Sequence, residues 1–231
     1  MKSRFLLCSL ATAATALAIF GASASGQVDA ARFSTRIDNP WFPLQPGTTY
    51  VYTGSESGKP SRDVLTVTNR TITIAGVKCR VVRDLVYVEG RLTEPTNDYY
   101  AQDSAGNVWY FGEDTAELDR NGHVTTREGT WRAGVRGAKP GILMPAQPVL
   151  GKAYRQEFFK GHAEDFARAI SVFHTVSGPQ GSNGLLTEEW SPLEPGILDH
   201  KMYVRGIGNV LERTVKGGDD HLELLSVHTR G

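Results

Sequence analysis

The sequence predicts an all-β domain: a single antiparallel meander sheet curved into a barrel or half-barrel. Runs rich in Val, Ile, Thr, Tyr, Phe and Trp alternate between apolar and polar residues over most of the chain, which is the period of strands. Closely spaced turn signals of Gly, Asn and Asp separate the runs, and such short turns join neighbouring antiparallel strands. About ten to twelve strands in one sheet should close or nearly close, because closure removes exposed edges.

The N-terminus has the pattern of a secretory signal peptide at residues 1–24. Two basic residues precede a mostly apolar run from Phe5 to Phe20, and small residues at 22–24 supply the cleavage site. This run is shorter than the roughly 20 residues of a spanning helix, so no integral membrane segment is expected after cleavage. We predict a secreted protein, extracellular or periplasmic, with a flexible N-terminus at 25–37 and a single β domain at 38–231.

Charge and cysteine content exclude some classes of protein. The chain has 25 basic and 25 acidic residues, and loss of Lys2 and Arg4 with the signal peptide leaves a net charge of −2. This balance argues against a nucleic-acid partner, which would need clustered basic residues. Cys79 is the one cysteine left after cleavage, so the fold must be stabilised by apolar burial rather than by an internal disulfide.

The first part of the predicted domain combines a clasp with the first strands. Asp38–Leu44 holds two prolines, which exclude a regular central strand, among apolar residues that should not be left in water. We expect it to pack against one end of the sheet. A strand follows at Tyr50–Tyr52, then a polar loop at 55–61 and strands at 63–74 and 77–88.

The hairpin at 97–114 is the strongest local signal. Two runs rich in Tyr, Trp and Phe flank the turn Asp103–Asn107, and large side chains fall on both faces. It is therefore expected to lie centrally in the sheet.

The second half begins with an irregular segment. Residues 133–151 contain four glycines and three prolines around Ile142, Leu143 and Met144, which predicts a long ordered loop over one opening of the barrel. Further strands are expected at 153–159, 162–176, 185–190, 198–204, 210–215 and 221–227. One helical turn between Phe166 and Ile170 is left open.

Three constellations are candidates for chemistry. Around the hairpin lie the acids Glu94, Asp98, Asp103, Glu113 and Asp114. Two carboxylates about 5 to 9 Å apart over an aromatic groove would suit a glycosidase. The alternative is that these acids are solvated and the aromatic residues form core.

The second constellation is Gly161–Asp165. On a strand, His162 and Glu164 would share a face about 7 Å apart, close enough for one metal ion or a proton relay. The alternative is that Glu164 or Asp165 accepts hydrogen bonds from backbone N–H groups. The candidate catalytic residues are thus Glu113, Glu164 and Asp165, with His162 and Glu164 as candidate metal ligands. No cofactor is predicted, and a divalent metal is left open.

In the third constellation, an acid of the Glu188–Pro195 segment is predicted to form a surface ion pair with Lys201 or Arg155. Such a pair would contribute well under about 1 kcal/mol to stability.

Several stretches resemble a family of exported bacterial proteins that is known only as uncharacterised. These are DNPWFPL from Asp38, DYYAQDSAGNVWYFGED from Asp98 and PLEP from Pro192. The resemblance extends to about Glu212 and implies no activity. The run KMYVRGIGNVLE from Lys201 is also similar to the last strands of periplasmic lipoprotein-carrier half-barrels, which implies shape only.

The leading hypothesis is a monomeric binding protein that holds a small apolar or amphipathic molecule in the concave face of its sheet. The ligand-binding candidates are Tyr99, Tyr100, Trp109, Tyr110, Trp131 and Met144. One alternative is an extracellular hydrolase, directed at polysaccharide and assisted by carboxylates or a metal. The other is an interaction module of the cell envelope.

Overall fold

The computed structural model describes residues 29–174 and 183–230, so the predicted signal peptide lies outside the described residues. The described part begins with a 3-10 turn, η1 (Ala30–Arg32), and continues almost entirely in strands. The first nine are β1 (Phe33–Ser34), β2 (Thr48–Glu56), β3 (Lys59–Ile74), β4 (Val77–Val88), β5 (Arg91–Asp103), β6 (Val108–Thr115), β7 (Glu117–Leu118), β8 (Val124–Thr126) and β9 (Trp131–Arg132). The others are β10 (Lys139–Met144), β11 (Ala153–Arg155), β12 (Glu157–Phe158), β13 (Phe166–His174), β14 (Asn183–Trp190), β15 (Leu198–Val204), β16 (Gly208–Lys216) and β17 (His221–Thr229).

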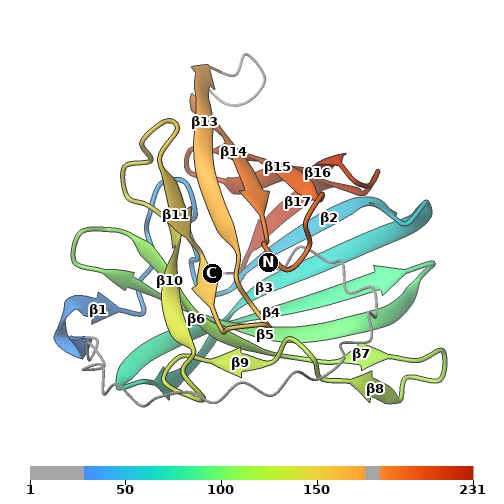
Figure 1. The fold of residues 1–231 in the computed structure, drawn as a ribbon, viewed down its shortest axis with the longest axis horizontal. Helices are drawn as coiled ribbons and strands as arrows, with labels where there is room; N and C mark the ends of the chain where they lie inside the picture. The colour runs from blue at the N-terminus through green and yellow to red at the C-terminus, as the bar shows by residue number, and fades with distance from the viewer. Residues whose placement is uncertain (1–28, 175–182, 231) are drawn as a thin grey trace, which may run out of the picture.

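Fifteen of these strands form one sheet that curves round on itself (Figure 1). Its order is β11-β13-β14-β15-β16-β17-β2-β3-β4-β5-β6-β10-β12, with β1 added to β5 and β9 to β6, while β7 and β8 form a separate hairpin. The two ends of the order, β11 and β12, are consecutive in the chain and separated by Gln156 alone. The sheet is therefore nearly closed into a barrel with one unsealed seam, which confirms the predicted fold class.

The segment 133–151 differs from its prediction as a loop. Its middle forms β10, which pairs with β6 through residues 141–144. Pro140 lies outside that paired stretch, where β10 pairs with β12 at the seam, and Pro145 and Pro148 follow the end of the strand. The prolines thus lie outside the stretch where β10 hydrogen-bonds to β6, so their missing N–H groups do not interrupt that pairing. Three prolines in the segment therefore did not exclude a strand.

Two smaller predictions also change. The polar segment 55–61 is mostly strand, because β2 and β3 extend to a tight turn at Ser57–Gly58 whose exposed end explains the polar composition. The segment from Phe166 forms strand rather than a helical turn.

The N-terminal segment packs on the barrel. β1 pairs with β5 and Ile37 is buried, so ordered structure begins before Asp38. Trp41 and Phe42 are buried as expected for a clasp, and the ring of Phe42 lies 5.7 Å from that of Tyr100.

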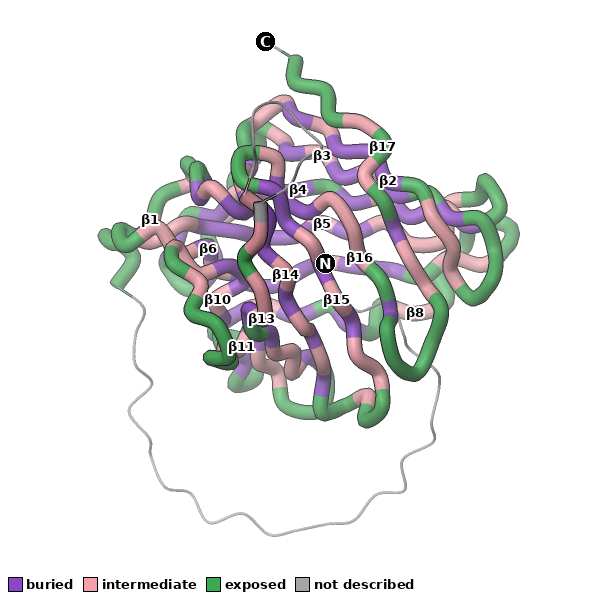
Figure 2. Tube along the Cα trace, turned by 90° about the horizontal axis from the view of Figure 1, so that it is seen from above, coloured by how far each residue is buried: buried purple, intermediate pink, exposed green. Residues whose placement is uncertain are grey.

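Buried and more exposed residues alternate along the strands (Figure 2), as expected for a sheet with one face inside. On β14, for example, Leu185, Thr187 and Glu189 are buried while the residues between them are only partly covered. Most buried side chains are apolar, but the interior also holds carboxylates from several strands. These carboxylates define the candidate site.

Candidate functional site

Four neighbouring strands, β3 to β6, each place one carboxylate inside the barrel. These residues, called the acid belt below, are Asp63, Asp84, Asp98 and Glu113, with exposures of 0%, 7%, 2% and 1%. Such burial is rare for acids, because removing a charge from water is costly.

The strand register shows that the acid belt is continuous. Asp84 on β4 lies opposite Leu65 on β3 and opposite Thr96 on β5. Asp63 and Asp98 lie two residues from these partners, so both are diagonal neighbours of Asp84 on the same face. Asp98 is directly opposite the fourth member on β6. The belt therefore runs obliquely across the inner wall.

A bulge brings Glu113 into the belt. Strict alternation would group Glu113 with Trp109 and Phe111, away from Tyr110. Between the pairs formed by Tyr110 and Glu113, however, β6 has one residue more than β5, and Gly112 there has a φ of +128°. The extra residue turns the Glu113 side chain to the inner face. A Cβ at position 112 would lie 2.2 Å from the carbonyl oxygen of Trp131, so glycine is required.

Burial raises the pKa of Asp98 to about 6 from its ordinary 3.8. The nearby carboxylates of Asp84 and Glu94 act in the same direction, whereas a 2.7 Å hydrogen bond from the hydroxyl of Tyr110 opposes them. Burial likewise raises the pKa of Tyr110 well above 10, so this phenol is a neutral donor. Ionisation of Asp98 at neutral pH therefore has an energetic cost.

An aromatic wall adjoins the acid belt. The rings of Tyr100 and Tyr110 are stacked with centroids 4.9 Å apart, and Trp131 contacts Tyr110 edge-on at 5.5 Å. The indole N–H of Trp131 donates to Glu157 at 3.0 Å. At the other end of the belt, Tyr52 lies opposite Asp63 in the register. Aromatic faces and carboxylates therefore occupy one surface.

On this surface, Oδ1 of Asp84 and Oγ of Ser61 are buried without a hydrogen-bond partner. Ser61 is 5% exposed and lies two residues before Asp63, on the same face of β3. Buried polar atoms in native proteins are nearly always hydrogen-bonded, so each exception requires an explanation.

The opposite wall, on β14 to β16, has a different arrangement, which we call the lysine cluster: Glu189, Lys201 and Glu212. The ammonium of Lys201 lies 3.0 Å from Glu189 and 3.4 Å from Glu212. Burial alone would lower the pKa of Lys201, but the two carboxylates more than offset it and raise that pKa. The predicted pairing of Lys201 with an acid is thus present, but as a buried pair and not on the surface.

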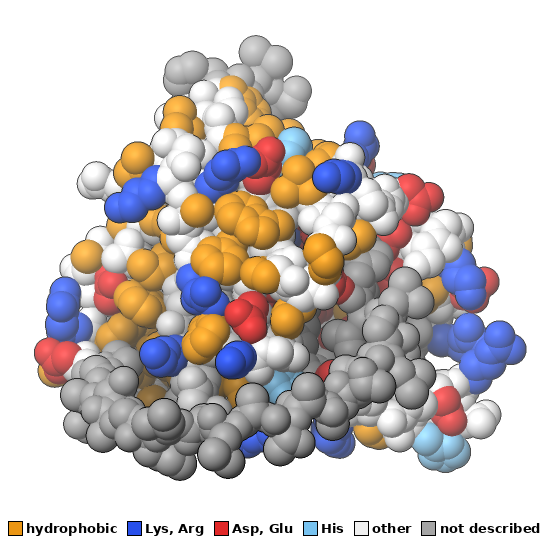
Figure 3. Space-filling model, viewed as in Figure 1, with side chains coloured by type: hydrophobic (Ala, Val, Ile, Leu, Met, Phe, Trp, Pro, Cys, Tyr) orange, Lys and Arg blue, Asp and Glu red, His pale blue; other side chains and the backbone are white. Residues whose placement is uncertain are grey.

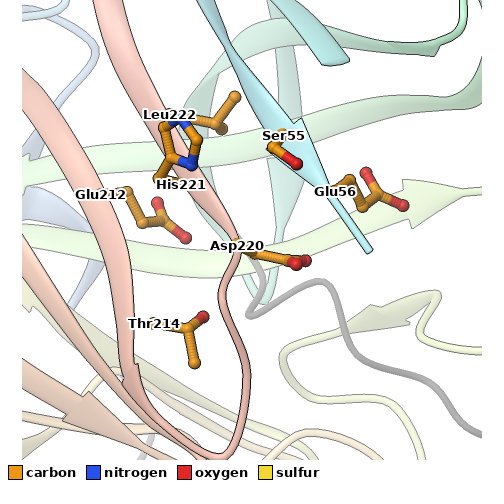
Figure 4. Close-up of a pocket in the computed structure, with 7 residues that line it drawn as sticks. All are labelled: Ser55, Glu56, Glu212, Thr214, Asp220, His221 and Leu222. Carbon is orange, nitrogen blue, oxygen red and sulfur yellow. The ribbon is translucent and has the colours of Figure 1, made fainter. Parts of the chain in front are cut away.

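Two small hollows are lined by described residues. The first lies between the ends of β2, β16 and β17 (Figure 4) and has a volume of about 20 Å³. It is lined by Ser55, Glu56, Glu212, Thr214, Asp220, His221 and Leu222. The second, beneath the clasp, offers about 10 Å³. At this size each suits about one water molecule.

The predicted ligand-binding residues fall into two groups. Tyr100, Tyr110, Trp131 and Met144 are buried in the core, the first three beside the acid belt. The other two project from the other face of the hairpin, where Tyr99 is also buried in the core and Trp109 is partly buried. There the Tyr99 hydroxyl donates to Asp114 at 2.8 Å and Trp109 donates to Asp103 at 2.8 Å.

In the Gly161–Asp165 segment, His162 and Glu164 have partners in or near their own segment. Glu164 accepts from the backbone N–H of Gly161 at 2.8 Å and lies 3.7 Å from Arg155, while His162 stacks on Phe159. The backbone-anchoring alternative describes Glu164 well. Among the described residues, no three His, Cys, Asp or Glu side chains are grouped so as to hold a metal ion.

Sequence reasoning did not identify Ser61, Asp63 and Asp84 as site residues. Asp84 lies between Val82 and Val86 on one predicted face, and a lone acid in a run of inward valines was the available signal. For Glu113 the signal was a glycine inside a strand, which often marks a bulge.

The outer face near the seam mixes cationic and hydrophobic side chains (Figure 3). The guanidinium of Arg155 lies 4.5 Å from the ring centre of Phe158 and 4.3 Å from that of Phe166, which stacks on Trp190. Arg168 lies over the same tryptophan and pairs with Glu188. These contacts cover apolar rings on the outside of the barrel.

Comparisons with known proteins give little. No protein-family model matches the chain, and no curated protein matches it. One solved crystal structure, described as "a putative lipoprotein from Parabacteroides distasonis", is 10% identical with a TM-score of 0.43, over 81% of this chain and 98% of that one. A likeness at this level carries no weight for function, and the predicted family resemblance stays a prediction.

Within the described ranges, no helix combines the length and apolar character needed to cross a bilayer.

Proposed function

We propose that this is an exported binding protein that holds a small amphipathic molecule inside the barrel, between the acid belt and the aromatic wall. The observation that carries the proposal is the buried, unpartnered Oδ1 of Asp84 on the inward face. A bound molecule with a hydrogen-bond donor would satisfy it.

The same surface favours an amphipathic ligand over a purely apolar one. A hydrocarbon placed against the acid belt would leave the carboxylate of Asp84 unsatisfied, which costs about 1–3 kcal/mol or more for a charged group. Rings such as Tyr100 and Tyr110 provide the complementary apolar contact. The ligand should therefore have one polar end and one apolar body.

The test is uptake of the neutral fluorescent probe N-phenyl-1-naphthylamine by the mature chain, together with solvent extraction and mass spectrometry of protein from its native source. We expect probe fluorescence to rise on binding and a small molecule to be extracted. Ser61→Phe, which fills the interior, should abolish uptake. Thr53→Phe, at an exposed position of β2, is the matched control and should retain it. Failure of the folded wild-type chain to take up the probe, with nothing extracted, would reject the proposal.

A second candidate, a hydrolase, is favoured by one specific observation. Asp84 and Asp98 are diagonal neighbours on adjacent strands, and burial raises the pKa of Asp98 to about 6. Glycosidases use a carboxylic acid with a raised pKa beside a second carboxylate. Reducing-sugar release from a panel of soluble polysaccharides tests it. Activity in the wild type that survives Asp98→Asn, or no activity on any substrate, would remove this candidate.

A further inference from the structure

Resting on the proposed function, we infer that the polar end of the ligand is a protonated amine, bound by Asp84 with its neighbours in the acid belt. This assigns a charge and a hydrogen-bonding class to the molecule. The inference stands on the strand register, on the burial of the belt and on the unpartnered Oδ1 of Asp84.

The first step concerns charge. Asp84 and Asp98 are diagonal neighbours on β4 and β5, and the carboxylate of Asp84 helps to raise the pKa of Asp98. A cation placed against these carboxylates would convert their mutual repulsion into attraction, and it would gain most because the site is shielded from water.

The second step concerns hydrogen bonding. An ionised carboxylate accepts hydrogen bonds and donates none, so the free oxygen of Asp84 requires a donor. A primary ammonium group has three donors and no acceptor, so one of its N–H groups can satisfy this oxygen. A quaternary ammonium has the charge without the N–H groups, and an alcohol has a donor without the charge.

The third step compares the buried charges of this wall with those of the opposite wall. Lys201 is the one basic side chain among the buried residues that the structure describes, and it lies between Glu189 and Glu212 on the far side. That cluster already contains an ammonium group held by two carboxylates. An amine at the acid belt would reproduce the same chemistry with a group supplied by the ligand.

The experiment compares four amphiphiles with the same chain: dodecylamine, dodecyltrimethylammonium, dodecanol and dodecanoate. Each is titrated below its micellar concentration at pH 7.5 into mature protein loaded with N-phenyl-1-naphthylamine, and displacement of the probe gives the affinity. We expect dodecylamine to bind at least about tenfold more tightly than the other three, a difference of about 1.4 kcal/mol.

Two variants locate the effect. Asp84→Asn should weaken dodecylamine binding about tenfold or more and leave dodecanol nearly unchanged, because it removes charge and keeps the side-chain shape. Glu223→Gln removes one negative charge from the exposed face of β17 and should leave all four affinities unchanged. Unfolding curves establish that both variants are folded.

The outcomes separate the two proposals. Equal binding of all four amphiphiles, or an Asp84→Asn variant that still prefers dodecylamine, would overturn the amine assignment and leave the binding function standing. Equal affinity for dodecylamine and the quaternary ion would overturn the role of the N–H donors. If the neutral probe itself does not bind, the proposed function fails as well.

Discussion

The two inner walls of the barrel bury acids in different ways. On β14 to β16, the carboxylates of Glu189 and Glu212 flank the ammonium of Lys201. On β3 to β6, the acid belt brings together four carboxylates from consecutive strands, and its members are themselves all acids. The first wall supplies its own counter-ion, as a structural ion pair does, whereas the second is the surface to which we assign ligand binding in the proposed function.

The difference teaches that burial of charge alone does not indicate function. Glu189 is as buried as Asp84, yet it accepts hydrogen bonds from Thr187 and Tyr203 and contacts a lysine. Asp84 has an oxygen with no partner. What distinguishes a candidate site is therefore the incomplete satisfaction of its polar groups.

The largest effect should come from removing the internal cation. Lys201→Met leaves the two flanking carboxylates buried without it and should lower the free energy of unfolding by about 3–5 kcal/mol. Urea denaturation measures this, with Lys152→Met, at an exposed position, expected to change stability by less than about 0.5 kcal/mol. Equal stability of the two variants would mean that the lysine cluster is not structural.

The next largest effect should be the pH dependence of stability that the ionisation of Asp98 causes. Its pKa is higher in the folded state than in the unfolded state, about 6 against 3.8, so ionisation opposes folding. The penalty is absent below about pH 4, grows between pH 4 and 6, and amounts to about 3 kcal/mol above that. Asp98→Asn should therefore gain stability over the wild type at pH 7.5 relative to pH 4, as measured by urea denaturation at both pH values.

Asp119 gives a control of opposite sign. Hydrogen bonds from the backbone N–H groups of His123 and Asn121 hold the pKa of Asp119 below its usual value. Its ionisation favours the folded state above pH 3.8, and this contribution is lost as the pH falls below that value, so Asp119→Asn should lose stability at pH 7.5 relative to about pH 2. Shifts of the same sign in both variants would contradict the assignment of Asp98 as a destabilising buried acid.

A smaller effect should follow from removing the bulge glycine. Gly112→Ala combines a positive φ with a close approach to the Trp131 carbonyl, whereas Gly122→Ala has a φ of +80° and open space around it. We expect the first to destabilise the fold by about 2 kcal/mol more than the second. Urea denaturation measures the difference. Similar costs would show that Glu113 can enter the belt without this bulge.

The smallest effect should come from the outer surface. Glu188, next to Glu189 in the chain but on the outside, pairs with Arg168 and lies 3.7 Å from His200. Because this pair is partly exposed, Glu188→Gln should cost less than about 1 kcal/mol in thermal or urea unfolding, while Glu189→Gln should cost clearly more. The reverse order would overturn the distinction between outer pairs and inner ones.

The sequence allowed much of the fold to be predicted and less of the site. Local patterns were sufficient for the hairpin at 97–114, because alternation and turn chemistry act over a few residues. They failed for β10, since a proline count cannot show that Pro140 lies at a seam. They also failed for Asp63 and Asp84, which become neighbours only through the register of β3 and β4.

By itself the sequence determined that the chain forms antiparallel strands with one face buried, because period-2 alternation and short turns are properties of neighbouring residues. Only the tertiary structure decided which acids face inward together. Pairing register, the bulge at Gly112 and closure of the sheet join side chains that are distant in the chain, and these depend on how whole strands fit against one another.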